Sequence, residues 1–341
     1  MQIEKNVSVG SLTTFHIEAK ASRLLTLKSE NELPALCEAF RAEKGAARRP
    51  LILGAGSNVL FTGDYDGLVA VNRLTGVREL EPGPEGEYRF RAASGETMDH
   101  LVRMLTLSGH PGLENLILIP GSVGGAAVQN IGAYGLEAAE RIESVEVFDL
   151  EDGSRRVLSC EECDFRYRDS VFKRPQAASW LVTAVTFSLP APRAWRPVTG
   201  YKGLAAALEG KPLDAAAVMH AVEALRRAKL PDPETVGNAG SFFKNPVIPE
   251  LQARALLESY PSLVSYPLGG RRTKLAAGWL IEAAGFKGAS VGAAAVWDRQ
   301  ALVLVNRGGA TGRDVEALCG RIVEGIERKF GVRLTPEVVI L

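Results

Sequence analysis

Apolar residues recur along this chain with two different spacings, and each spacing predicts a type of secondary structure. Between Glu30 and Glu43, and again between Thr97 and Ser108, they lie three and four residues apart, as on one face of an α-helix. The run Pro50–Leu53 is short and apolar throughout, which is typical of a buried strand. Residues 1–70 are therefore predicted to form a small α/β unit. From about Gly67 onward, strands predominate.

The middle of the chain carries the signals of a β-hairpin. Ser144–Leu150 alternates between apolar and polar residues, Asp152-Gly153 is a strong turn signal, and Ser154–Leu158 continues beyond it. A further strand is predicted over Trp180–Leu189. The prolines of Pro190–Pro197 mark a boundary or an excursion of the chain after that strand.

Helices and strands alternate in the last third. An alanine-rich helix over about Asp214–Ala228 must end at the prolines of Lys229–Pro233. Thr311 and Asp314 have the spacing of a capping pair and predict the start of a long helix. The remaining elements are predicted as a helix over Ala276–Ala284, a strand over Ala301–Val305 and a terminal strand over Thr335–Leu341.

Composition narrows the class of protein. At 341 residues, two or three domains are expected. The formal net charge is +0, with 40 basic and 40 acidic side chains, which argues against a nucleic-acid or anionic membrane surface. The N-terminus lacks the pattern of a signal peptide, and no apolar run is long enough to cross a bilayer. We therefore expect a cytoplasmic protein.

Cysteine and histidine give little support for a metal or disulfide site. Cys160 and Cys163 have the spacing of a redox pair or of half a zinc site, but no second pair and no nearby histidine completes a metal shell. The histidines are scattered singly, so we expect no metal.

The most informative segment is the glycine- and alanine-rich stretch Ile119–Gly135. Its bare backbone can adopt positive φ angles and bring N–H groups against a large flat or anionic ligand, although a purely structural turn is the alternative. A second such loop, Gly54–Asn58, follows the Pro50–Leu53 strand, which is the usual geometry of a phosphate cradle. It lacks the lysine of a Walker loop and is a poor dinucleotide fingerprint.

Three other short segments combine reactive groups with a tight backbone. Phe165–Ser170 contains aromatic and guanidinium groups, and a surface salt-bridge patch is its alternative explanation. Gly237–Pro246 places Ser241 between small residues and two aromatics, an arrangement that could hold a hydroxyl in a dry pocket but that resembles no serine-hydrolase elbow. Glu337 is either an exposed edge residue or a buried acid suited to proton transfer.

Taken in order along the chain, these segments closely resemble the UDP-N-acetylenolpyruvoylglucosamine reductase family. The resemblance runs from Thr14-Phe15 to Glu337, and its most specific motifs are Gly240–Pro246 and Ile131–Gly135. It implies an α+β fold, with a two-part FAD-binding region of the vanillyl-alcohol oxidase type and a C-terminal α/β substrate-binding domain. The implied boundaries are 1–70 and 71–212 for the FAD-binding subdomains and 213–334 for the substrate domain, with the terminal strand 335–341 returning to the second subdomain.

The resemblance also implies the reaction: NADPH reduces non-covalently bound FAD, which reduces the enolpyruvyl group of a nucleotide sugar to give UDP-N-acetylmuramate. Arg168 would bind the substrate carboxylate, Glu337 would polarise the enolate, and Ser241 would deliver the proton, with Lys244 as a possible aid. The residues matching the cofactor segments are Gly54, Ala55, Gly56, Ser57, Asn58, Ile119, Pro120, Gly121, Ser122, Gly124, Gly125, Ala126, Asn130, Ile131, Gly132, Ala133 and Tyr134.

Substrate binding is assigned in the same way. The segment Trp195–Tyr201 matches the form of the family with an extra tyrosine loop, so Tyr201 would cover the uridine-diphosphate part of the substrate. Lys229 would neutralise the diphosphate and Asn245 would hydrogen-bond it. Tyr167 and Tyr266 are the further substrate-binding candidates. We expect a monomer whose partners are the nucleotide sugar and NADPH.

Two departures and two rival functions qualify this picture. Val339 stands where some relatives have arginine, and Thr13 replaces an asparagine common before Thr-Phe. An oxidase on the same fold would often tether FAD through a histidine, which neither glycine loop contains. A nucleotide-sugar-binding protein without catalysis would have lost Arg168, Ser241 or Glu337, and all three are present.

Overall fold

A computed structural model describes residues 2–43, 45, 48–201 and 203–341 of the chain. The chain divides into two compact units, and neither is continuous in sequence. The first unit comprises Met1–Val7, Ala21–Gly56 and Asp66–Ala228, and the second comprises Ser8–Lys20, Ser57–Tyr65 and Lys229–Leu341. The three-part division expected from the sequence assigns functions to segments and stays a prediction.

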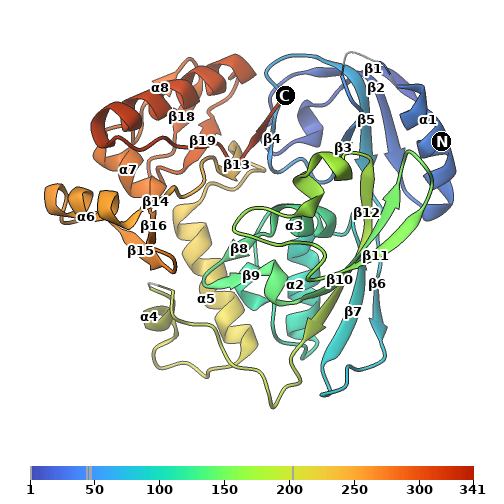
Figure 1. Ribbon diagram of the computed structural model, residues 1–341, viewed down its shortest axis with the longest axis horizontal. Helices are drawn as coiled ribbons and strands as arrows, with labels where there is room; N and C mark the ends of the chain where they lie inside the picture. Colours follow the sequence, from blue (N-terminus) through green and yellow to red (C-terminus); the bar gives the residue numbers. More distant parts are fainter. Residues whose placement is uncertain (1, 44, 46–47, 202) are drawn as a thin grey trace. The chain divides into compact units, whose positions relative to one another are not determined.

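Two sheets form most of the first unit (Figure 1). Their strands are β1 (Glu4–Ser8), β2 (Lys20–Leu27), β3 (Leu51–Leu53), β5 (Tyr65–Asn72), β6 (Val77–Leu80), β7 (Tyr88–Ala93), β10 (Ile142–Asp149), β11 (Arg155–Ser159) and β12 (Trp180–Leu189). The first sheet has the order β1-β2-β5-β3, with β3 parallel to β5. The second is antiparallel, with the order β11-β10-β12-β7-β6.

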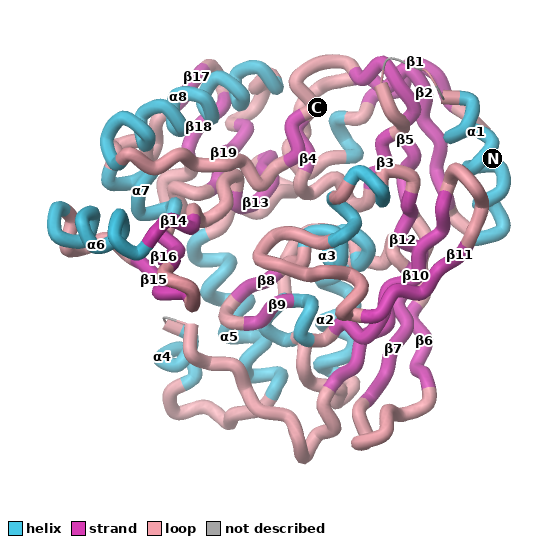
Figure 2. The backbone as a smooth tube through the Cα atoms, viewed as in Figure 1, coloured by secondary structure: helices cyan, strands magenta, loops and turns pink. Residues whose placement is uncertain are grey.

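Helices lie beside these sheets (Figure 2), and their apolar side chains share cores with the strands. The helices of this unit are α1 (Leu33–Ala42), α2 (Met98–Leu107), α3 (Val123–Gln129), α4 (Leu204–Leu208) and α5 (Ala215–Lys229), and a small hairpin joins β8 (Gly132–Ala133) to β9 (Leu136–Glu137). Leu101 of α2, Val123 of α3 and Met219 of α5 are buried in one core with Val185 of β12. Within the described ranges, no helix has the length and apolar character that crossing a membrane requires.

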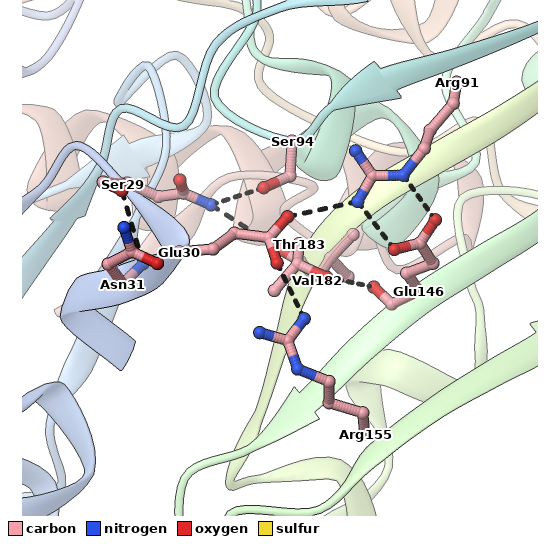
Figure 3. Close-up of polar contacts among 10 residues, drawn as sticks. Ser29, Glu30, Asn31, Arg91, Ser94, Glu146, Arg155, Val182 and Thr183 are labelled. Carbon is pink, nitrogen blue, oxygen red and sulfur yellow. Dashed lines mark hydrogen bonds and ion pairs between the residues drawn. The ribbon is translucent and has the colours of Figure 1, made fainter. Parts of the chain in front are cut away.

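An ionic network joins the 3-10 helix Glu30–Glu32, which precedes α1, to the antiparallel sheet (Figure 3). Arg91 on β7 donates to both carboxylate oxygens of Glu146 on β10, at 2.6 and 2.7 Å, and to Glu30 at 3.1 Å. Arg155 on β11 donates to the other oxygen of Glu30 at 2.7 Å and lowers the pKa of Glu30. A groove of about 680 Å³ runs along this network, and none of the predicted site residues lines it.

The second unit is built from shorter elements. They are β4 (Val59–Leu60), β13 (Gly237–Ser241), β14 (Val247–Pro249), α6 (Glu250–Ser259), β15 (Ser265–Leu268), β16 (Arg272–Leu275), α7 (Ala277–Ala283), β17 (Ser290–Val291), β18 (Ala294–Val296), β19 (Val303–Asn306), α8 (Gly312–Phe330) and β20 (Val339–Ile340). The strands form sheets of order β13-β19-β18-β17, β14-β16-β15 and β20-β4. Helices α7 and α8 bury Leu280, Leu318 and Ile322 against them.

Several predicted elements are confirmed. Strand β12 has the predicted bounds, and the predicted hairpin is the antiparallel pair of β10 and β11. Thr311 and Asp314 form a reciprocal capping box at the start of α8, as their spacing predicts.

Three expectations differ from the structure. The stretch Ile119–Gly135, expected to be an open loop, contains the seven-residue helix α3. Helix α5, expected to open the substrate domain at 213, packs in the core of the first unit. The terminal strand was expected to return to residues 71–212, but β20 is two residues long and runs parallel to β4. The pairing is decided by Val339 and Leu341, whose N–H groups donate to Asn58 and Leu60.

Two glycines of α8 give a matched pair of stability variants. A Cβ at Gly312 would lie 1.9 Å from the carbonyl oxygen of Phe61, whereas a Cβ at Gly320 would meet nothing within 4 Å. We expect Gly312→Ala to lower the free energy of unfolding by more than about 3 kcal/mol, because backbone must move. Gly320→Ala should raise it by about 0.5–1 kcal/mol through helix propensity. Urea unfolding of both variants checks this, and equal effects would contradict the packing of α8 on Phe61.

Candidate functional site

The two glycine-rich segments meet in the first unit. Strand β3 ends at Gly54, and Ser122 is the N-cap of α3, where its hydroxyl accepts a hydrogen bond from the N–H of Gly125. A Cβ added to Gly54 would lie 2.5 Å from the Ser122 hydroxyl oxygen. A Cβ added to Gly124 would lie 2.9 Å from the Cβ of Ser94. Gly54 is therefore required for close packing of the two segments, and Gly124 is required for the close approach of α3 to Ser94.

Several backbone N–H groups at this junction are unpaired. Those of Ala55, Gly56, Gly121 and Ser122 donate to no other residue that the structure describes. By contrast, the N–H groups of the first turn of α3 bind Glu96, Ser94 and Ser122 within the protein. Because Gly56 has φ of +65°, its loop can form a concave row of N–H groups, which suits an anion. The donors available to a ligand thus precede the helix and do not belong to its N-terminus.

Two arginines beside these segments were missed by the sequence reasoning. Arg73 donates to the carbonyl of Gly54 at 2.9 Å. Arg73 directly follows β5, which is the parallel neighbour of β3. Because the carboxyl ends of parallel strands lie at one edge of a sheet, the position of Arg73 after a strand is the sequence signal that could have indicated it. Arg226 of α5 donates to the Leu118 carbonyl at 3.0 Å, while its buried Nε has no partner among the described residues. Burial lowers the pKa of Arg226, and Tyr134 and Asp99 oppose that shift.

Arg168 is fixed on the end of α3. It lies in a tight turn with φ of +54° between Arg166 and Asp169, whose backbones form an antiparallel bridge. Its guanidinium donates to the carbonyls of Asn130 at 3.1 Å and Gly132 at 2.8 Å. A cation suits the carbonyl of Asn130 because Asn130 caps the C-terminus of α3, which is the negative end of the helix dipole. The fork of Arg168 is thereby oriented before any ligand binds.

Asn130 is a structural centre of this region. It is buried, ends α3 with φ of +42°, and donates from its amide to Glu137 at 2.9 Å and to the Arg166 carbonyl at 3.0 Å. Its amide oxygen accepts from the N–H of Ala139. The side chain of Asn130 therefore already has hydrogen-bond partners within the protein. If Asn130 contacts a cofactor, as predicted, it does so through its backbone.

Three of the predicted aromatic residues lie in the first unit. The rings of Tyr134 and Tyr201 are 4.8 Å apart between centroids, and burial raises the pKa of Tyr134. Tyr201 is 46% exposed, so a large part of its ring is accessible to a ligand. Tyr167 lies against the guanidinium of Arg168, 5.2 Å from ring centroid to Cζ.

Ser241 and Glu337 are brought together in the second unit by backbone pairing. The N–H of Glu337 donates to the carbonyl of Phe242 at 2.8 Å, and Phe243 forms a bridge with Pro336. Phe242 and Phe243 are fully buried and anchor the strand, while Ser241 at the end of β13 is exposed and Glu337 is half-buried. Because Ser241 is exposed, the residues of this unit do not enclose it in the dry pocket expected from the sequence. Glu337 is not a fully exposed edge residue.

The N-terminal segment holds this strand in place. Thr14 exchanges two hydrogen bonds with Asn238, its carbonyl accepting at 2.8 Å and its hydroxyl donating at 2.6 Å. A Cβ at Gly237 would lie 2.3 Å from the Phe15 carbonyl oxygen. The Thr-Phe motif is therefore a clamp on β13. Thr13 is buried and bonds to Gly10, as expected of a packing residue.

The predicted diphosphate ligands of the second unit have suitable chemistry. Lys229 is exposed at the end of α5, and its carbonyl accepts from the indole of Trp297 at 3.1 Å. The amide oxygen of Asn245 accepts from the N–H of Ala277 at 2.9 Å, which orients the amide nitrogen as the donor. Tyr266 is 44% exposed, and Lys274 lies 5.8 Å from the centroid of its ring.

Cys160 and Cys163 are both free thiols. Burial raises the pKa of Cys163 to about 12, so it is a thiol and not a thiolate at neutral pH. In the part of the chain that the structure describes, no group of three or more potential ligand side chains is placed to hold a metal ion.

Comparisons with known proteins agree on one family. Residues 21–159 match an FAD binding domain, and residues 232–341 match the C-terminal domain of UDP-N-acetylenolpyruvoylglucosamine reductase. The reductase of that name from Bordetella pertussis is 48% identical over 330 residues, which are 96% of this chain and 92% of that protein. The one from Azoarcus sp. is 46% identical and covers 100% of this chain. The crystal structure of the UDP-N-acetylenolpyruvylglucosamine reductase from Thermus caldophilus, which is 26% identical in sequence, superposes with a TM-score of 0.66. The match covers 100% of this chain and 99% of that one. The expected α+β fold class is confirmed.

Proposed function

Because the chain belongs to the UDP-N-acetylenolpyruvoylglucosamine reductase family, we propose that it reduces UDP-N-acetylglucosamine enolpyruvate to UDP-N-acetylmuramate in peptidoglycan precursor synthesis. It uses FAD as cofactor and NADPH as reductant. The observation that carries this function is the junction of Gly54 and Ser122, where two segments with unpaired N–H groups meet.

The residues at this junction fit FAD. The pyrophosphate of FAD needs several N–H donors and little side-chain bulk, and the segments around Gly56 and Gly121 offer both. Arg73 adds a positive charge beside Gly54. The Nε of Arg226, which has no hydrogen-bond partner among the described residues, would be a donor beside Tyr134 for a polar edge of the flavin ring system. When bound, FAD would supply the hydride-transfer chemistry between NADPH and the enolpyruvyl double bond.

The chain's own residues manage the charge and the proton. Reduction of the double bond leaves negative charge shared between carbon and carboxylate, and that charge needs a cation, a polarising group and a proton. Arg168 would bind the carboxylate with its fixed guanidinium fork. Glu337 would help to polarise the enolate, and the hydroxyl of Ser241 would donate the proton to carbon.

The remaining predicted residues would bind the nucleotide. Lys229 offers an ammonium and Asn245 an oriented amide nitrogen, which are the donors that a diphosphate requires. Tyr201 and Tyr266 expose aromatic rings that can cover the uridine-diphosphate part, and Tyr167 would help to bind the substrate.

Purification of the protein followed by a coupled assay tests this function. We expect yellow protein, release of unmodified FAD on denaturation, and NADPH oxidation that depends on the enolpyruvyl nucleotide sugar. Colourless protein that binds no added FAD would overturn the proposal. Oxidation of NADPH without dependence on the nucleotide sugar would overturn the substrate assignment.

Gly54→Ala tests the FAD junction separately. The new Cβ would lie 2.5 Å from the Ser122 hydroxyl oxygen but 3.5 Å from the Ser122 Cβ. We expect Gly54→Ala to lower FAD affinity at least about tenfold, because the segments must separate by several tenths of an ångström. Fluorescence titration of apoprotein with FAD measures the affinity.

The double variant Gly54→Ala/Ser122→Ala is the control, since it removes the clashing oxygen. It should recover most of the FAD affinity, although loss of the N-cap costs about 1 kcal/mol of stability. If the single and the double variant bind FAD equally, the contact between Gly54 and Ser122 does not shape the site.

A further inference from the structure

Two adjacent buried residues, Glu114 and Asn115, are bonded to the loop that carries Tyr201. They lie in a short 3-10 helix, Glu114–Leu116, and are 2% and 0% exposed. One oxygen of Glu114 accepts from the indole N–H of Trp195 at 2.7 Å, and the other accepts from the N–H of Gly112 at 2.6 Å. The amide nitrogen of Asn115 donates to the carbonyl of Val198 at 2.8 Å.

The loop has little structure of its own to hold it. Among residues 190–201, which follow β12, the structure has no helix or strand, as Figure 2 shows. No backbone–backbone hydrogen bond joins residues 196–200 to another residue within the described ranges. The position of the loop therefore depends on the side chains that reach it from elsewhere.

The same amide also reaches Tyr134, whose ring lies against the ring of Tyr201. The second hydrogen of the Asn115 amide goes to the carbonyl of Tyr134 at 2.9 Å. A Cβ at Gly135, the next residue, would lie 3.0 Å from Cγ1 of Val198. One side chain thus sets the separation between the backbones of Tyr134 and Val198, and the rings of Tyr134 and Tyr201 meet 4.8 Å apart beyond it.

We infer that Glu114 and Asn115 are positioning residues for nucleotide-sugar binding. They hold the Trp195–Tyr201 loop on the first unit so that the Tyr201 ring is placed before substrate arrives, and the entropy of ordering the loop is not lost on binding. This inference rests on the proposed function only in the identity of the ligand, because the anchoring itself is a property of the first unit.

Trp195→Phe is the decisive variant, because it keeps an aromatic side chain and removes the indole N–H that Glu114 accepts, together with the smaller ring that carries it. Trp180→Phe is its matched control: Trp180 is also half-buried, and its indole donates to the carboxylate of Asp149 at 3.2 Å. We expect Trp195→Phe to raise the KM for the nucleotide sugar about tenfold and to leave NADPH-driven reduction of FAD within about twofold of wild type. Trp180→Phe should change neither.

A second readout does not depend on activity. Arg193, two residues before Trp195, is exposed, and trypsin cleavage after it requires the local chain to open. We expect cleavage at Arg193 to become about tenfold faster in Trp195→Phe and to stay unchanged in Trp180→Phe. Asn115→Asp, which sets a carboxylate against two carbonyl oxygens, should act in the same direction, and the Trp195 variant decides the matter if that protein does not fold.

The outcomes separate the two proposals. Wild-type protein that does not reduce the enolpyruvyl substrate would overturn the proposed function and leave the proteolysis result to test the anchor. If wild type is active and Trp195→Phe shows neither faster cleavage nor a higher KM, the positioning role is wrong. Faster cleavage with an unchanged KM would also overturn it, because the loop would then be anchored without consequence for the substrate.

Discussion

Ser241→Ala should abolish most product formation while NADPH still reduces the bound FAD at the wild-type rate. The hydroxyl of Ser241 is exposed at the end of β13, and no described residue hydrogen-bonds to it. Loss of a positioned proton donor typically costs a hundred- to ten-thousandfold in rate, and we expect a loss of about a thousandfold here. Stopped-flow absorbance separates the two half-reactions, since FAD is first reduced by NADPH and then re-oxidised by the nucleotide sugar.

Ser259→Ala is the control for this experiment. Ser259 is an exposed serine of the same unit at the end of α6, and its hydroxyl donates to the carbonyl of Ala255 and to no other residue that the structure describes. Both half-reactions should stay at wild-type rates in that variant. If Ser241→Ala re-oxidises FAD as fast as Ser259→Ala does, then another group donates the proton.

Arg168→Lys should lower kcat/KM for the nucleotide sugar by about a hundred- to a thousandfold although the positive charge is kept. Lysine is a point charge and cannot bind a carboxylate with two parallel N–H groups. It would also lose the two bonds that orient Arg168, to the carbonyls of Asn130 and Gly132. Steady-state kinetics with varied nucleotide sugar measures the loss, and the FAD content of the purified variant is determined in parallel.

Arg166→Lys provides the comparison within the same turn. The side chain of Arg166 is 67% exposed, and among the described residues it pairs only with Asp164, so its replacement should leave kcat/KM within about twofold. The two variants then differ in the hydrogen bonds lost and not in charge. Similar losses in both would indicate that the turn as a whole matters and that Arg168 has no particular role.

The elements that sequence predicted well are those whose local signals agree with their packing. Strand β12 is a largely apolar run that is followed directly by the proline-rich segment Pro190–Pro197. Both of its ends fall where predicted. Helix α8 begins at a capping box and ends at Gly331 with φ of +62°, so each end has its own chemical cause. Such segments need no knowledge of their neighbours.

Helix α3 shows why the rest could not be predicted. Glycine disfavours helix, by about 1 kcal/mol for each of Gly124 and Gly125 relative to alanine. The helix forms because only a glycine at 124 lets its backbone approach Ser94. The residues that sequence patterns did not indicate also depend on distant partners. Arg73, Asn115 and Arg226 each donate a hydrogen bond to a carbonyl 19 or more residues away, and no local pattern reveals such a bond.

The discontinuity of the second unit sets an order of events during synthesis. Its segments 8–20 and 57–65 leave the ribosome early, but their partners lie in residues 229–341, so their contact order is very high. The first unit, by contrast, is complete once residue 228 has been made. We therefore expect cotranslational folding to begin with the first unit while Thr14, Phe15 and β4 wait without partners. During that interval the nascent chain exposes the apolar residues Phe15, Leu60 and Phe61, and this is when it most needs a chaperone.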